Sequence, residues 1–152
     1  MSAKKQSPRD ELIDALNGDL AREYQAIIAY VNYSQVLKGA EYMTIAAELE
    51  THAAEELTHA LKIAKQIDYL GGMPTVKPEP VKTSDDPIEM LKFDLDSELQ
   101  TIGHYRKRIR EAEELNEFAL CEELRSIVTQ EQEHAIDLAT ALGIEVPPIP
   151  EV

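Results

Sequence analysis

The positions of the prolines most constrain how this chain can fold. The 152-residue sequence contains 8 prolines, and they lie at residue 8, at residues 74–87 or at residues 147–150. Because proline interrupts helix interiors, uninterrupted helices are allowed only in the two long windows 9–73 and 88–146. Alanine, leucine and glutamate, which are strong helix formers, are abundant in both windows. Each window is long enough for two helices.

Glycines and capping residues divide each window in two. Gly39 and Gly71 stand where helices commonly end, and Gly143 repeats this signal near the end of the chain. Asp86 and Asn116 stand where side chains commonly cap the start of a helix. The four helices predicted from these signals span residues 8–38, 40–70, 87–115 and 117–142.

The segment between the second and third helices is unlike the other connections. Residues 75–85 (TVKPEPVKTSD) have no helical periodicity and read as a long extended crossover, so the helices on either side of it run parallel. We therefore expect an all-α fold, a four-helix bundle with one long crossover between its second and third helices, in a single domain over residues 1–152. The proline-rich residues 143–152 are not expected to form a fifth helix.

Every predicted helix carries a glutamate in the middle of its apolar face, where an aliphatic residue would pack. These residues are Glu23, Glu56, Glu98 and Glu131. In the first helix, for example, the apolar face reads Leu16, Leu20, Glu23, Ile27 and Tyr30. No lysine or arginine lies in the four stripes, so facing carboxylates must take up protons or bind cations. Two divalent cations balance four carboxylates.

Two histidines extend this pattern. His59 follows Glu56 by three residues and His134 follows Glu131 by three residues, so each histidine shares a helix face with its glutamate. Carboxylate oxygens with one imidazole per metal suit iron or manganese better than structural zinc, which prefers nitrogen and sulfur ligands. The sequence therefore predicts a buried site for two metal ions.

Charge and composition exclude several other classes of protein. The chain has 29 acidic and 15 basic residues and a formal charge of -14, which argues against nucleic-acid binding. It has no apolar run near the ~20 residues that span a bilayer, and residues 1–30 lack the apolar stretch that is typical of a signal peptide. With a single cysteine, Cys121, no internal disulfide can form. A cytoplasmic protein without membrane contacts is expected.

The order of these residues resembles a known family. Glu23, E56-L-T-H59, Glu98 and E131-Q-E-H134, together with YQAIIAY at residues 24–30, are similar to the ferritin-like di-iron carboxylate proteins, and most of all to bacterioferritin. The resemblance covers about residues 8–143. It implies two iron ions per chain, with manganese as the other candidate.

The resemblance also implies a role for each residue. Glu23 and His59 would hold one iron, Glu98 and His134 the other, and Glu56 and Glu131 would bridge the two. Tyr30 matches the tyrosine that lies beside the di-iron site in the family, where it donates an electron or a hydrogen bond.

Three departures from bacterioferritin change what is expected. Leu57 replaces the methionine that binds haem, so haem is not expected. The missing fifth helix favours a dimer or a smaller cage over a shell of 24 subunits, with outward-facing Tyr33, Tyr42 and Tyr69 as candidate interface residues. The aspartates that precede the bridging glutamates in the family, as partners of the histidines, are replaced by Glu55 and Gln130.

The expected function is that of a ferroxidase, which oxidises Fe(II) with O2 or H2O2 for iron storage or detoxification. One alternative is a rubrerythrin-like peroxidase or oxygenase that depends on a separate reductase as electron donor. Another is a non-catalytic, metal-binding helical assembly module. His52, one turn before Glu56, is expected to be an exposed or core-edge histidine, with an outer iron site as the alternative, and His104 is expected at the surface.

Overall fold

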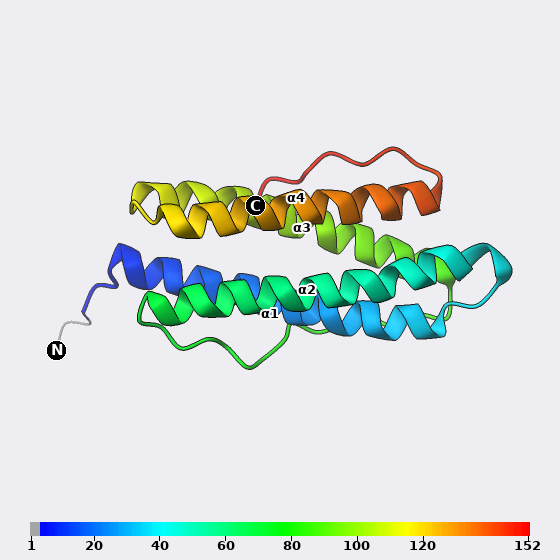
Figure 1. Ribbon diagram of the computed structural model, residues 1–152, viewed down its shortest axis with the longest axis horizontal. Coiled ribbons are helices and arrows are strands. Elements are labelled where there is room, and N and C mark those ends of the chain that lie inside the picture. Colours follow the sequence, from blue (N-terminus) through cyan, green and yellow to red (C-terminus); the bar gives the residue numbers. More distant parts are fainter. Residues whose placement is uncertain (1–3) are drawn as a thin grey trace.

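Four long helices dominate the computed structural model, which describes residues 4–152. They are α1 (Pro8–Val36), α2 (Met43–Tyr69), α3 (Pro87–Glu114) and α4 (Phe118–Leu142), and a 3-10 helix, η1 (Ala40–Tyr42), precedes α2. Figure 1 shows two antiparallel hairpins, α1 with α2 and α3 with α4, packed side by side. The predicted all-α four-helix bundle is confirmed.

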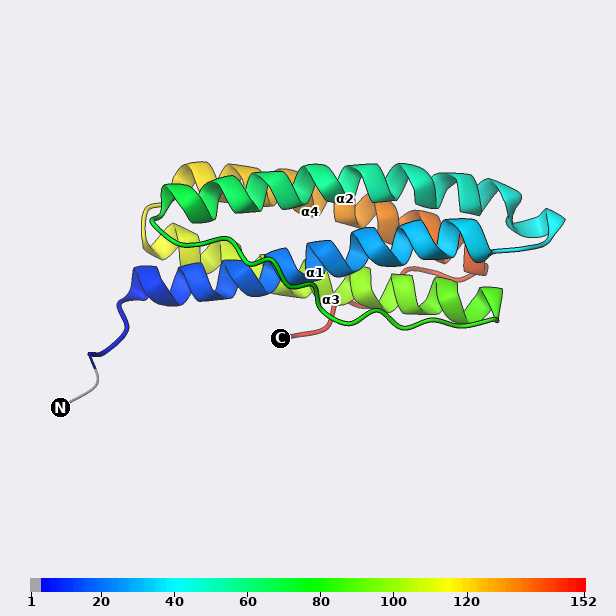
Figure 2. The ribbon, with the colours of Figure 1, turned by 90° about the horizontal axis from the view of Figure 1, so that it is seen from below.

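The long connection from α2 to α3 sets the direction of the second hairpin. It runs along the outside of the bundle beside α1, so α2 and α3 point the same way, as expected (Figure 2). Two points on α1 hold it in place. The side chain of Asn17 donates to the carbonyl of Met73 at 3.0 Å and accepts from the amide of Thr75 at 2.7 Å, and the amide of Glu79 donates to the carbonyl of Ala21 at 3.1 Å. The crossover is thus fixed to the helix that it passes.

The helix ends follow the capping signals with two exceptions. Asp86 caps α3 by accepting from the amide of Ile88 at 3.1 Å, as predicted. The second helix begins at Met43 rather than at residue 40, because the chain first makes η1 after Gly39, whose φ is +120°. Asn116 does not cap α4: its φ is +59°, and no side chain caps that helix.

The core consists of two apolar clusters, one toward each end of the bundle. The first includes Leu16, Ile63, Leu120 and Leu124, and the second includes Leu49, Leu91, Leu95 and Leu138. Tyr33 belongs to the second cluster and is 2% exposed, so the expectation that it faces outward is wrong. Its hydroxyl donates to the carbonyl of Lys82 in the crossover instead.

After α4, the chain turns back along the bundle without forming another helix (Figure 1). The backbone of Pro150 packs so closely on α3 that a Cβ at Gly103 would lie 2.6 Å from the Pro150 oxygen. Glycine is therefore required at residue 103 in this arrangement. Within residues 4–152, no helix is both long enough and apolar enough to cross a membrane.

Candidate metal centre

Six side chains from all four helices form a buried cluster between the two apolar clusters. Its members are Glu23 from α1, Glu56 and His59 from α2, Glu98 from α3, and Glu131 and His134 from α4. None is more than 3% exposed. The helical repeat explains this convergence, because each glutamate interrupts an inward-facing apolar stripe and each histidine follows a glutamate on the same face. All six candidate ligands are thus brought together.

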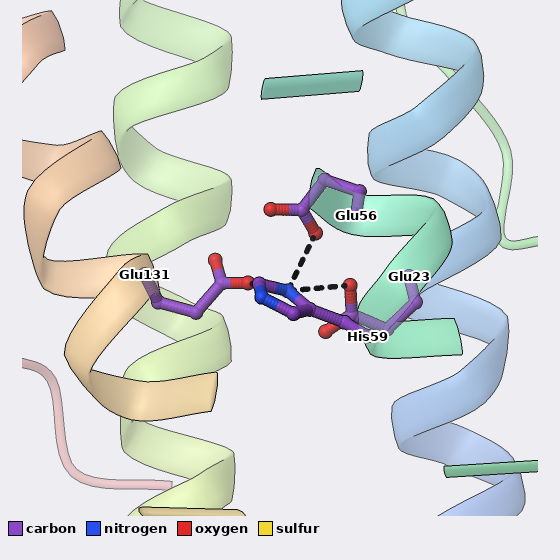
Figure 3. Close-up of side chains that lie close together, drawn as sticks. All are labelled: Glu23, Glu56, His59 and Glu131. Atoms are coloured by element: carbon purple, nitrogen blue, oxygen red, sulfur yellow. Dashed lines mark ion pairs between the residues drawn. The ribbon is translucent and has the colours of Figure 1, made fainter. Parts of the chain in front are cut away.

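One half of the buried cluster surrounds His59 (Figure 3). Its Nδ1 lies 2.7 Å from Glu131 Oε1, 3.6 Å from Glu23 Oε2 and 3.7 Å from Glu56 Oε2. One ligand atom from each of these four residues lies within 4.8 Å of all the others. This separation is small enough for a single cation to contact all four side chains.

The other half surrounds His134. Its Nδ1 lies 2.8 Å from Glu56 Oε1, 3.8 Å from Glu98 Oε1 and 3.9 Å from Glu131 Oε2. One ligand atom from each of Glu56, Glu98, Glu131 and His134 likewise lies within 4.8 Å of the others. Glu56 and Glu131 therefore belong to both halves, and each directs one carboxylate oxygen toward His59 and the other toward His134.

Both histidines are held by hydrogen bonds on their outer nitrogens. His59 Nε2 lies 2.5 Å from the amide oxygen of Gln130, and His134 Nε2 lies 3.2 Å from a carboxylate oxygen of Glu55. Since these oxygens only accept, the proton of each neutral ring is on Nε2 and the lone pair is on Nδ1. The replacements Glu55 and Gln130 thus hold the tautomer that a metal ligand needs.

Seven side-chain atoms of the buried cluster lack hydrogen-bond partners. They are Nδ1 of both histidines, Glu23 Oε2, Glu56 Oε1, Glu98 Oε2 and both oxygens of Glu131. Buried polar atoms in proteins are nearly always satisfied, so this concentration of free acceptors requires an explanation. Imidazole nitrogen and carboxylate oxygen are the ligands that iron and manganese accept. The residues present therefore fit two divalent cations.

Burial and neighbouring groups shift the pKa values of Glu56 and Glu23 in opposite directions. Burial raises the pKa of Glu56 well above its usual value, and the charges of Glu23 and Glu98 raise it further. Burial also acts to raise the pKa of Glu23, but Glu56 and His59 offset this and leave that pKa lowered. Within residues 4–152, no lysine or arginine forms an ion pair with any of these residues. Cations would supply the missing positive charge.

Two buried tyrosines contact the buried cluster from opposite sides. The hydroxyl of Tyr30 donates to Glu98 Oε1 at 2.7 Å, and the hydroxyl of Tyr105 donates to Glu23. Burial, followed by nearby carboxylates, raises the pKa of both hydroxyls well above the usual value, so both keep their protons. Tyr30, the tyrosine singled out from the sequence, therefore lies beside the cluster.

Sequence reasoning missed several buried polar residues near the buried cluster. Asp94 lies one turn before Glu98 on the same stripe and is 3% exposed, and this spacing was the signal for it. Asp19 pairs with Arg108 across α1 and α3, with 2.7 Å between Oδ2 and Nε. His52 is 1% exposed, so the expectation of a histidine at the surface or core edge is wrong for it, whereas His104 is partly buried.

Comparison with protein families matches residues 13–145 to the ferritin-like domain family. The chain belongs to this ferritin-like family. Two bacterioferritins, from Desulfovibrio desulfuricans and Rhodobacter capsulatus, are each 27% identical to it over 135 residues. Those alignments cover 88% of this chain in both cases, and 75% and 84% of the two relatives.

Solved structures place this ferritin-like chain near the di-iron proteins. A crystal structure described as ferritin like, diiron-carboxylate proteins from Bacillus anthracis superposes with a TM-score of 0.87 and 36% sequence identity. The match covers 91% of this chain and 99% of that one. The predicted membership of the ferritin-like di-iron superfamily, near bacterioferritin, is confirmed.

Proposed function

We propose that this protein is a ferroxidase with a bacterioferritin-like di-iron site. The observation that carries the proposal is the pair of four-residue ligand groups that share Glu56 and Glu131. In this proposal Glu23 and His59 bind one iron, Glu98 and His134 bind the other, and the two shared glutamates bridge them. Four carboxylates balance the charge of two divalent ions, and manganese fits the same ligands.

The proposed reaction takes Fe(II) as its substrate. Two Fe(II) ions each give up one electron, and O2 takes both electrons with two protons to become H2O2. With H2O2 as oxidant, two electrons and two protons yield two molecules of water. Bound in the buried cluster, the two irons would supply the electrons, and the protein would set their spacing and leave positions for the oxidant.

The chain's own residues would orient the metal ligands and exclude water from the site. Glu55 and Gln130 fix the orientation of the two imidazoles through their Nε2 hydrogens. Tyr30 donates a hydrogen bond to Glu98 through its hydroxyl, and in this proposal it is the residue that would supply an electron or a hydrogen bond at the site. The apolar clusters on both sides keep water from the site. Leu57, 52% exposed on α2, offers no thioether, so no haem is part of this proposal.

We further propose that the protein works as a cytoplasmic homo-oligomer. Large apolar side chains are exposed on the outer faces of α1 and α2, including Val31, Leu57 and Leu61. The single cysteine, Cys121, is a buried free thiol, which suits a reducing compartment. The mass by size-exclusion chromatography with light scattering, together with iron counted per chain after loading in air, tests both assembly and storage. About two irons per chain would contradict storage of a mineral core.

The activity is tested by the rate of Fe(II) oxidation in air, followed at the absorbance of Fe(III). The double variant Glu23→Ala with Glu131→Ala removes one terminal and one bridging ligand and is expected to oxidise Fe(II) no faster than buffer. A matched control, Glu11→Ala with Glu133→Ala, removes exposed glutamates from the same two helices and is expected to retain the parent rate. Equal rates in the parent and in the first variant would refute the proposal.

Assays of the same purified protein distinguish the ferroxidase from the two alternatives, a peroxidase or oxygenase and a non-catalytic assembly module. Peroxide turnover that requires a reduced electron donor and exceeds Fe(II) oxidation would indicate a peroxidase. Two bound metals per chain without oxidation would indicate an assembly module.

A further inference from the structure

A second group of metal-binding side chains lies outside the buried cluster. Nε2 of His52, on α2, is 3.0 Å from Asp137 Oδ2, on α4, and 3.7 Å from Glu48 Oε1, one turn earlier on α2. One ligand atom from each residue lies within 4.8 Å of the others. None of the three residues belongs to either group in the buried cluster.

His52 is an unusual residue for a purely structural hydrogen bond. The side chain is 1% exposed, and its Nδ1 has no hydrogen-bond partner. Its ring is stacked on His134, with 3.9 Å between centroids, and contacts the ring of Tyr30 edge-on. A buried ring fixed from two sides presents Nε2 in one direction, toward the two carboxylates. This is the arrangement of a preorganised ligand.

The carboxylates themselves face solvent. The side chains of Glu48 and Asp137 are 47% and 40% exposed, and both line a cavity of about 300 Å³ between the start of α2 and the end of α4. The cavity is also lined by Tyr42, Thr44, Ile45 and Thr140. A cation held by these three side chains would therefore keep open positions for water.

We propose that Glu48, His52 and Asp137 form a third binding site for a divalent transition-metal cation, open to the cavity and separate from the buried pair. Nε2 of His52 with two carboxylate oxygens suits first-row divalent ions, and two negative charges neutralise one such ion. Binding moves the ring proton from Nε2 to Nδ1, which has no hydrogen-bond partner in the metal-free protein. The burial of His52 and the cavity beside the carboxylates support the site independently of each other. The proposal does not rest on the proposed ferroxidase activity.

Zn(II) is a suitable probe because it does not change oxidation state. Calorimetry on the full chain is expected to give one Zn(II) more per chain for the parent than for Glu48→Gln with Asp137→Asn. Both substituted side chains are partly exposed and nearly isosteric, so the fold is retained, which the metal-free melting temperature checks. The control, Glu50→Gln with Glu133→Gln, removes exposed carboxylates from the same helices and is expected to keep the parent stoichiometry.

Anomalous scattering from Zn(II)-soaked crystals locates the ions. The expected result is a peak about 2.0–2.1 Å from Nε2 of His52 in the parent and none there in the variant. Equal stoichiometry in parent and variant, or the absence of this peak in the parent, would overturn the third site. Peaks in the buried cluster are scored separately, so loss of those peaks alone contradicts the proposed function and leaves the third site standing.

Discussion

The substitution Glu56→Gln separates the effect of metal binding from the stability of the metal-free fold. Burial and the charges of Glu23 and Glu98 raise the pKa of Glu56 well above its usual value, which favours the protonated carboxyl in the metal-free protein. Glutamine has the shape and neutrality of that protonated form. We therefore expect the metal-free variant to unfold within about 1 kcal/mol of the parent, which corresponds to about 2–4 °C in melting temperature.

Bound metal is expected to make the parent more stable than the Glu56→Gln variant. A ligand at 100 times its dissociation constant stabilises the folded state by about 2.7 kcal/mol per site, so two sites supply about 5 kcal/mol. For a chain of this length that amounts to a rise of about 10–20 °C in melting temperature. Because Glu56 belongs to both ligand groups, its loss weakens both sites, and the variant is expected to keep less than half of the rise.

The assay is differential scanning calorimetry of both proteins with and without Co(II). Glu50→Gln, an exposed substitution on the same helix, is the control and is expected to behave as the parent. A Co(II)-induced rise as large in Glu56→Gln as in the parent would refute the bridging role. A metal-free variant that is several kcal/mol less stable would refute the argument from the raised pKa.

Three further predictions concern the surroundings of the buried cluster. Tyr30→Phe removes the hydrogen bond to Glu98, so urea denaturation should show a loss of about 1.5–3 kcal/mol, and Fe(II) oxidation should slow; an unchanged free energy of unfolding would contradict this. Arg108→Met deprives buried Asp19 of one of its two cationic partners, since Arg22 also pairs with it, and is expected to lower stability by about 1.5–3 kcal/mol. Adding Asp19→Asn should restore most of that loss, and failure to do so would show that the pair does not act through charge. Burial, followed by the charge of Glu98, raises the pKa of Asp94 well above 3.8, its value in the unfolded chain. The folded protein therefore loses stability as pH rises from 3.8 through the raised pKa, because ionised Asp94 is disfavoured in the fold. Relative to Asp94→Asn, the parent should therefore gain stability on acidification toward pH 4, and parallel pH profiles in urea would contradict this.

The buried cluster was predictable because its geometry is local to each helix. Helical spacing of three and four residues places Glu98 on the inward face of its helix, independently of how the neighbouring helices pack. The same holds for His134, three residues after Glu131. Once four such helices form a bundle with one crossover, the four inward glutamates must lie near its axis. The sequence therefore defined both the fold and the members of the cluster.

Contacts between helices were harder to predict. Asp19 and Arg108 are 89 residues apart, and their pairing depends on how α1 and α3 are rotated against each other. The outward prediction for Tyr33 failed for the same reason, since the crossover supplies a carbonyl that only the folded chain brings near. His52 lies four residues before Glu56, so helical spacing alone would have placed it inward.

The central claim is that two metal ions share Glu56 and Glu131. It is tested most directly by anomalous diffraction at the iron edge from crystals loaded with Fe(II) without oxygen. Two iron peaks are expected in the buried cluster, one beside Nδ1 of His59 and one beside Nδ1 of His134, with both shared glutamates between them. A single peak, or two peaks that do not share these glutamates, would contradict it.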